Sequence, residues 1–200
     1  MAVNRAACAH AVFLDKDGTL IDDLAYNVDP ARIRLTAHAG PGLRLLAQQG
    51  YALHVVSNQS GVALGLFPEH ALRGVEQRLR DLLDAQGIAL GSFYYCPHLP
   101  PEQAHVRCLC RKPAPGLLKR AAREHRLELA RCWMVGDILD DIEAGRRAGC
   151  RTVLIDNGNE TRWQLTAQRR PHARAAHLLQ AAELIVQADA ADGNAAGGAS

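Results

Sequence analysis

Two aspartates separated by one residue, Asp15 and Asp17, could carry the chemistry of this chain. They follow a short apolar run, residues 11–14, and precede Gly18, whose backbone freedom permits a sharp turn. Carboxylates placed in this way can do different work. The first can attack as a nucleophile, and the second can act as a general acid and base. Acidic turns with a glycine are also common without a function, so the hypothesis depends on the other motifs.

Three further segments carry side chains suited to a phosphorylated substrate. Ser57 opens the run Ser-Asn-Gln-Ser-Gly, in which a hydroxyl and neighbouring backbone N–H groups can hold a phosphoryl group. Arg111 and Lys112 can place a planar fork and a fixed positive charge beside phosphate oxygens. Asp137 follows another apolar run. Because Mg²⁺ keeps several waters, one or two carboxylates suffice to bind it, and we predict that Asp137 shares a magnesium ion with Asp15.

Four residues of metal-ligand type lie close together in the chain: Cys96, His98, Cys108 and Cys110. Three thiolates and an imidazole can bind a zinc ion tetrahedrally. Cysteines that form disulfides are not expected to cluster in one short segment in this way. With four protein ligands the site would be closed and therefore structural. We predict that zinc holds the loop 96–110 in shape and thereby aims Arg111 and Lys112, which follow it.

Segments typical of strands and helices alternate along the chain. Apolar runs predict strands at 11–14, 51–56, 92–95, 132–135 and 151–155, and apolar spacing predicts helices at 40–49, 68–87, 115–126, 142–148 and 173–187. This alternation indicates an α/β fold, a Rossmann-like parallel sheet with helices on both faces. Ligands of such sheets lie beyond the carboxyl ends of the strands, where Asp15, Ser57 and Asp137 would converge.

Size and composition fit one such domain. Of the 200 residues we assign 1–187 to a single domain and 188–200, rich in Ala and Gly, to a disordered tail. A net charge of +2 and 4% aromatic residues argue against a nucleic-acid partner. No apolar run approaches the roughly 20 residues of a membrane span. The N-terminus lacks the layout of a secretory signal, so we expect a cytoplasmic protein. The apolar patterns account for the core of a single chain, so we expect a monomer.

In this order, the strand-end motifs resemble the haloacid dehalogenase superfamily of phosphohydrolases over about residues 12–155. The resemblance implies an aspartyl-phosphate mechanism with Asp15 as nucleophile and Asp17 as acid and base. It also implies that Asp17 binds Mg²⁺ through its backbone carbonyl, and that Ser57 and Lys112 hold the transferring phosphoryl group. Donors and cations such as Ser57 and Lys112 suit this role, because stabilising the charge on the phosphoryl oxygens accounts for most of the catalysis of phosphoryl transfer.

The predicted zinc loop narrows the resemblance. The runs Tyr94-Tyr95-Cys96-Pro97-His98 and Cys108-Leu109-Cys110-Arg111-Lys112-Pro113 are similar to those of the D-glycero-D-manno-heptose 1,7-bisphosphate 7-phosphatases. This likeness implies that a large cap domain is missing and that a small phosphorylated sugar is bound by short loops. The expected activity is magnesium-dependent removal of the 7-phosphate in lipopolysaccharide synthesis. The residues expected to contact the substrate are Asn58, Gln59, Ser60 and Arg111.

Several points stay open. Ile138 stands where these phosphatases commonly carry a lysine, which leaves the exact substrate and its anomer undecided. Histidinol-phosphate phosphatases share the loop and are the alternative with the same chemistry. A polynucleotide 3′-phosphatase is a further variant, and a non-catalytic zinc module is the alternative of a different class. Asp141 could support Asp137 or Lys112 or contact the metal. Residues 156–163 match no pattern that we could assign.

Overall fold

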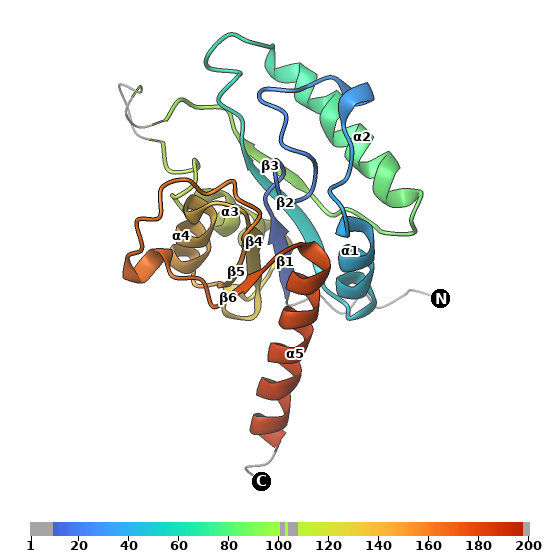
Figure 1. Ribbon diagram of the computed structural model, residues 1–200, viewed down its shortest axis with the longest axis vertical. Coiled ribbons are helices and arrows are strands. Elements are labelled where there is room, and N and C mark those ends of the chain that lie inside the picture. Colours follow the sequence, from blue (N-terminus) through green and yellow to red (C-terminus); the bar gives the residue numbers. More distant parts are fainter. Residues whose placement is uncertain (1–9, 101–102, 104–107, 198–200) are drawn as a thin grey trace.

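The computed structural model describes residues 10–100, 103 and 108–197, with side chains as far as residue 193. Its centre is a six-stranded sheet in the order β3-β2-β1-β4-β5-β6, in which all neighbouring strands are parallel. The strands are β1 (Ala11–Leu14), β2 (Ala52–Asn58), β3 (Phe93–Cys96), β4 (Trp133–Gly136), β5 (Arg151–Ile155) and β6 (Ala173–Ala175). Figure 1 shows the sheet running through the middle of the molecule.

Helices cover both faces of the sheet. They are α1 (Ala39–Gln48), α2 (Leu72–Asp84), α3 (Gly116–His125), α4 (Leu139–Ala148) and α5 (Leu178–Gly197), with short 3-10 helices at Pro30–Arg32, Glu69–Ala71, Leu129–Arg131 and Ala167–Arg169. In Figure 1, α1, α2 and α5 lie on one side of the sheet, and α3 and α4 lie on the other. The predicted Rossmann-like α/β fold is confirmed.

Strand β1 is apolar throughout because it is buried from both sides. Val12 and Leu14 belong to one core cluster with α1, α2 and α5, whereas Ala11 and Phe13 belong to the opposite cluster with α3 and α4. Side chains of a strand alternate between faces, so a central strand under two helix layers needs an unbroken apolar run. All four residues of β1 are 0% exposed. The strand is therefore a rigid base for the residue that follows it, Asp15.

The connections beyond the strand ends are loops with short helices. Within the described part of the chain, the connections after β1, β2 and β3 do not form a separate domain. This agrees with the predicted absence of a large cap. Helix α4 begins three positions earlier than its apolar spacing indicated. The Asp141 carboxylate accepts a hydrogen bond from the Ile138 N–H at 3.3 Å and so caps the helix start.

Two predictions at the C-terminal end are wrong. Residues 173–175 form β6 rather than the first turn of a helix, because Ala173 and Ala175 pair with Val153 and Ile155 of β5. Such pairing depends on the neighbouring strand and overrides the helix propensity of alanine. The last helix, α5, therefore begins only at Leu178.

Helix α5 also continues to Gly197, so residues 188–197 are not the disordered tail that their composition predicted, and the expected boundary at 187 falls inside a helix. Asp189 explains part of the difference. Its carboxylate accepts hydrogen bonds from the Tyr51 hydroxyl and, at 3.1 Å, from the Trp133 indole, and it pairs with Arg151. Residues 198–200 of the predicted tail lie outside the described residues. Among the described helices, none is long and apolar enough to cross a membrane.

Candidate active site

The carboxyl ends of β1, β2 and β4 bring three of the predicted site residues together. Asp15 follows β1 directly, Ser57 is the penultimate residue of β2, and Asp137 follows β4. These strands are neighbours in the sheet order, β2 and β4 on either side of β1. All three side chains are buried, at 8%, 1% and 4% exposure. Polar groups with so little contact with water need partners within the protein.

Lys112 is the main partner of Asp15. Its Nζ lies 2.5 Å from Asp15 Oδ1 and 2.6 Å from Asp141 Oδ1, and it donates to the carbonyl oxygen of Val56 at 2.9 Å. Burial lowers the pKa of Lys112, but Asp141 and Asp15 outweigh burial and raise the pKa above its usual value. The ammonium group is therefore charged and fixed beside Asp15, where a phosphoryl group would carry negative charge.

Asp141 is fully buried and holds this lysine in place. One carboxylate oxygen pairs with Lys112, and the other accepts from the backbone N–H of Ile138. Ligand atoms of Asp15, Asp137 and Asp141 all lie within 4.8 Å of one another. Since both oxygens of Asp141 already have partners, its geometry is that of a support for Lys112, one of the three roles left open by the sequence.

Asp137 faces Asp15 and has two neutral hydrogen-bond donors. Its Oδ1 accepts from the Thr19 hydroxyl at 3.0 Å, and its Oδ2 accepts from the Asn159 amide at 2.7 Å. Burial first, and then the charge of Asp15, raise the pKa of Asp137 to about 6. Two buried carboxylates that repel each other are a suitable oxygen pair for a divalent cation, and their chemistry fits Mg²⁺.

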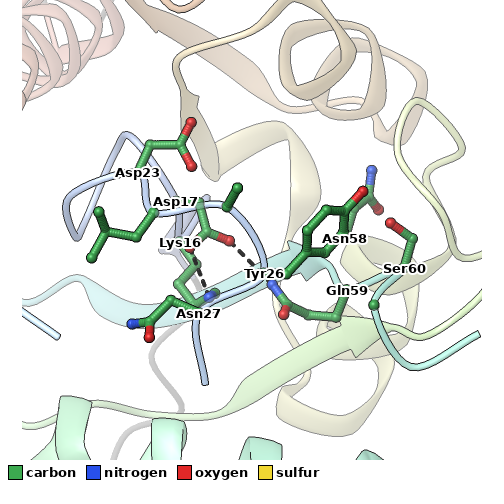
Figure 2. Close-up of a pocket in the computed structure, with 11 residues that line it drawn as sticks. Lys16, Asp17, Asp23, Tyr26, Asn27, Asn58, Gln59 and Ser60 are labelled. Carbon is green, nitrogen blue, oxygen red and sulfur yellow. Dashed lines mark hydrogen bonds and ion pairs between the residues drawn. The ribbon is translucent and has the colours of Figure 1, made fainter. Parts of the chain in front are cut away.

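Asp17 lines a pocket of about 260 Å³. Its carboxylate pairs with Lys16 Nζ at 2.7 Å and accepts from Gln59 Nε2 at 3.1 Å (Figure 2). Burial raises the pKa of Asp17, and Lys16 opposes the shift. A raised pKa favours the protonated form that a general acid needs. The binding of Mg²⁺ by its backbone carbonyl stays a prediction.

The residues after Ser57 mostly contact the catalytic candidates themselves. The Asn58 side chain donates to the Lys112 carbonyl at 3.1 Å and accepts from the Lys112 N–H at 3.0 Å. Gln59 Nε2 also donates to Ser57 Oγ at 2.8 Å. Ser60 lines the pocket of Asp17. The amides of Asn58 and Gln59 thus contact Lys112, Ser57 and Asp17. Both residues also line the pocket of Asp17, and their contact with substrate stays a prediction.

Arg111 lies at the edge of a second pocket, of about 500 Å³, on the Lys112 side of the site. Its guanidinium donates to the carbonyl oxygen of His98 at 3.1 Å. Ile138 and Arg162 line the same pocket. The apolar Ile138 side chain offers no charge to an anion here, so the cationic groups of this wall come from other residues.

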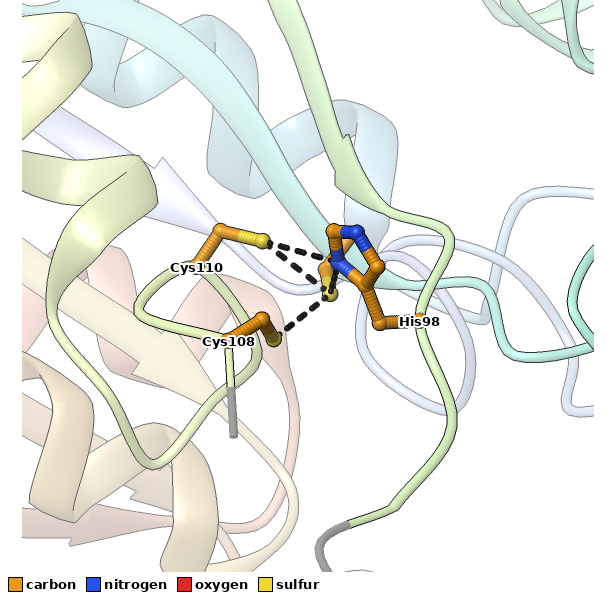
Figure 3. Close-up of side chains that lie close together, drawn as sticks. His98, Cys108 and Cys110 are labelled. Atoms are coloured by element: carbon orange, nitrogen blue, oxygen red, sulfur yellow. Dashed lines mark hydrogen bonds between the residues drawn. The ribbon is translucent and has the colours of Figure 1, made fainter. Parts of the chain in front are cut away.

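The four predicted zinc ligands gather beside β3, and their ligand atoms lie within 4.8 Å of one another (Figure 3). Cys96 Sγ lies 3.3 Å from His98 Nδ1, 3.6 Å from Cys108 Sγ and 3.3 Å from Cys110 Sγ. Ligands of a tetrahedral zinc ion with normal bond lengths are about 3.5–3.8 Å apart, so the donor set and its spacing fit this metal. The Arg111 N–H also donates to Cys108 Sγ at 3.4 Å, which connects the cluster to Arg111.

Sequence reasoning missed some residues of the site. Lys16 and Thr19 lie inside the first motif, yet their partners, Asp17 and Asp137, are apparent only in the structure. Asn159 follows β5 at the same edge of the sheet as the other polar residues. Its position shortly after the end of a predicted strand is the sequence feature that could have identified it.

Phosphoryl transfer is the reaction to which this arrangement is suited, because the buried ammonium group of Lys112 and the buried carboxylate of Asp137 lie close to Asp15, a possible nucleophile. This arrangement of side chains, on this fold, defines a phosphatase of the haloacid dehalogenase class. A family model described as "HAD-hyrolase-like" matches residues 109–181. The D-glycero-beta-D-manno-heptose-1,7-bisphosphate 7-phosphatase of Haemophilus ducreyi is 38% identical over 152 residues, covering 74% of this chain and 84% of the relative. The chain belongs to the family of heptose bisphosphate phosphatases.

Two further comparisons agree with this assignment. The D-glycero-alpha-D-manno-heptose-1,7-bisphosphate 7-phosphatase of Photorhabdus laumondii is 31% identical over 154 residues, covering 74% of this chain and 84% of the relative. The crystal structure of D,D-heptose 1,7-bisphosphate phosphatase from B. bronchiseptica, complexed with magnesium and phosphate, matches with a TM-score of 0.73. That match has 28% identity and covers 88% of this chain and 98% of the other.

Proposed function

We propose that this phosphatase is magnesium-dependent and removes the 7-phosphate of D-glycero-β-D-manno-heptose 1,7-bisphosphate. Its product would supply heptose nucleotides for lipopolysaccharide synthesis. The observation that carries the proposal is the placement of Lys112 and Asp137 close to Asp15 in a chain of this family. We further propose a monomer in the cytoplasm, where thiolate ligands stay reduced.

In the first step of the proposed reaction, an Asp15 carboxylate oxygen attacks the phosphorus of the 7-phosphate. The new bond is an aspartyl-phosphate, and the bond between phosphorus and the sugar oxygen breaks. Asp17, whose pKa is raised by burial, gives its proton to the departing sugar oxygen.

In the second step, Asp17 acts as the base. Its carboxylate takes a proton from water, and the water oxygen attacks the aspartyl-phosphate. The bond between phosphorus and Asp15 breaks, inorganic phosphate leaves, and both aspartates return to their starting forms. Lys112 and Ser57 would hold the phosphoryl oxygens in both steps, and Mg²⁺ on Asp15, Asp17 and Asp137 would supply positive charge to the same oxygens.

Two pockets next to the reacting residues could receive the sugar. One contains Asp17 and Ser60, and the other contains Arg111 and Lys112. The β anomer is favoured because the relative named for it is 38% identical, against 31% for the relative named for the α anomer. Histidinol phosphate remains the second candidate, because its phosphatases share the pattern of the zinc loop.

The test is phosphate release with Mg²⁺ from both anomers of heptose 1,7-bisphosphate, from histidinol phosphate and from a 3′-phosphorylated oligonucleotide. We expect kcat/KM for the β anomer to exceed the other values by at least tenfold. A preference for histidinol phosphate would keep the catalytic roles and refute the substrate. Equal values for the two anomers would refute the β assignment alone.

We also propose a structural zinc ion on Cys96, His98, Cys108 and Cys110. The closed set of four protein ligands supports a structural role, since a catalytic zinc keeps an open position. Arg111 contacts the cluster twice, through its backbone N–H and its guanidinium. Zinc bound here would therefore stabilise the segment that carries Arg111 and Lys112.

Removing this zinc is expected to lower Tm and to reduce kcat/KM, because the thiolates would repel each other and the Arg111 contacts would loosen. Zinc content by elemental analysis and Tm should be measured before and after chelation, and with Cys108→Ser. The matched control is Cys150→Ser, a buried cysteine outside the cluster, which should retain one zinc per chain. A wild-type protein free of zinc, with unchanged Tm after chelation, would contradict the proposal.

A further inference from the structure

The loop after β5, residues 156–160, reaches the candidate magnesium site through Asn159. The Asn159 amide donates to Oδ2 of Asp137 at 2.7 Å, and the Thr19 hydroxyl donates to Oδ1 of the same carboxylate at 3.0 Å. Each oxygen of Asp137 therefore accepts one hydrogen bond from a neutral donor. A carboxylate oxygen has two lone-pair sites, so each oxygen retains one for another partner.

The Asn159–Asp137 contact lies directly against the backbone of Gly18. A Cβ atom at Gly18 would be 2.2 Å from Asp137 Oδ2 and 2.3 Å from Asn159 Nδ2. Gly18 also has a φ of +76°, a conformation that other residues rarely adopt. The absence of a side chain at this position is thus what allows the amide and the carboxylate to meet.

Two further contacts hold the same loop on either side of Asn159. The Asn157 side chain donates to the Gly18 carbonyl oxygen at 2.8 Å and accepts from the Asn159 backbone N–H at 3.2 Å. Glu160 accepts from the Leu139 backbone N–H at 2.7 Å, at the start of α4. The loop is therefore attached to the segment after β1 and to the segment after β4, the two segments that carry Asp15 and Asp137.

We infer that Asn159 is a positioning residue for the magnesium site and holds the Asp137 carboxylate in the orientation that a shared cation requires. The inference rests on the proposed function, which gives Asp137 its role toward Mg²⁺. A neutral amide suits the task because it orients the carboxylate without neutralising it. A lysine or arginine at the same place would compete with Mg²⁺ for the charge of Asp137.

The test is Mg²⁺ binding by the full-length chain without substrate, measured by titration calorimetry. Asn159→Leu keeps the size of the side chain and removes its donor, and we expect it to raise the Kd for Mg²⁺ about 10-fold or more. Turnover of the variant should recover as the Mg²⁺ concentration is raised. Asn159 is exposed, so the substitution should not prevent folding, and Asn159→Ala offers a second variant.

Asp156→Ala is the matched control from the same loop. Asp156 is exposed and pairs only loosely with Arg174, at 3.7 Å, so its removal should leave the Kd for Mg²⁺ unchanged. An unchanged Kd in both Asn159 variants would overturn the inference. So would a higher KM for substrate at an unchanged Kd for Mg²⁺, which would make Asn159 a substrate contact.

The metal titration uses no substrate, so the two proposals fail separately. Inactivity of the wild-type chain toward heptose bisphosphates would refute the proposed substrate and leave the role of Asn159 standing. Normal activity combined with unchanged Mg²⁺ affinity in the variants would refute the role of Asn159 alone.

Discussion

Asp15→Asn is expected to reduce phosphate release by about 10⁴-fold or more, because the amide cannot form the aspartyl-phosphate. The fold should persist, since asparagine has nearly the same shape and Asp141 still pairs with Lys112. The measurement is kcat with Mg²⁺ at saturating substrate, together with Tm. Trapping of radiolabelled phosphate on the wild-type protein, and its absence from the variant, would identify the intermediate.

The control for this substitution is Asp84→Asn, which changes an exposed carboxylate at the end of α2, away from the strand ends. It should leave kcat and Tm unchanged. If the folded Asp15 variant turned over substrate within tenfold of the wild-type rate, Asp15 would not be the nucleophile. It would also favour the reading of the chain as a non-catalytic zinc module.

Lys112→Met is expected to destabilise the protein by about 3–5 kcal/mol, because it leaves two buried carboxylates without their counter-charge. It should also lower kcat by about 10²–10³-fold, since the cation beside the phosphoryl oxygens is lost. Urea unfolding measures the first effect and phosphate release the second. Lys119→Met, an exposed lysine on α3, is the control and should change neither quantity.

The loss of stability in this variant should depend on pH. Burial raises the pKa of Asp141 well above its usual value, and Lys112 opposes that shift. Without the lysine the pKa of Asp141 rises further in the folded state. Above about pH 4, Asp141 therefore carries a proton in the folded state that it lacks in the unfolded state. Stability of the variant then falls as pH rises from about 4 through the raised pKa. The difference from wild type should be smaller at pH 5 than at pH 8, and a difference independent of pH would contradict this account.

The sequence by itself determined the fold class and most of the residues that do chemistry. Both are local properties. An apolar run ending in a polar residue marks the carboxyl end of a buried strand, and parallel strands bring such ends to one edge of the sheet. Asp15, Ser57 and Asp137 could therefore be assigned to one place before any contact was known. The closely spaced cysteines and histidine of the 96–110 loop were equally apparent.

Only the tertiary structure decided which side chains orient these residues. Asn58 meets the backbone of Lys112 across 54 positions of sequence, and Asn157 meets Gly18 across 139. Pairing of Ala173 with Val153 likewise made a strand from a segment whose local pattern favoured a helix. In each case the partner comes from a distant segment, and local spacing carries no information about which segment will lie alongside. The chemistry that a residue can perform depends on its own side chain, whereas the orientation of that side chain depends on the neighbours that folding brings to it.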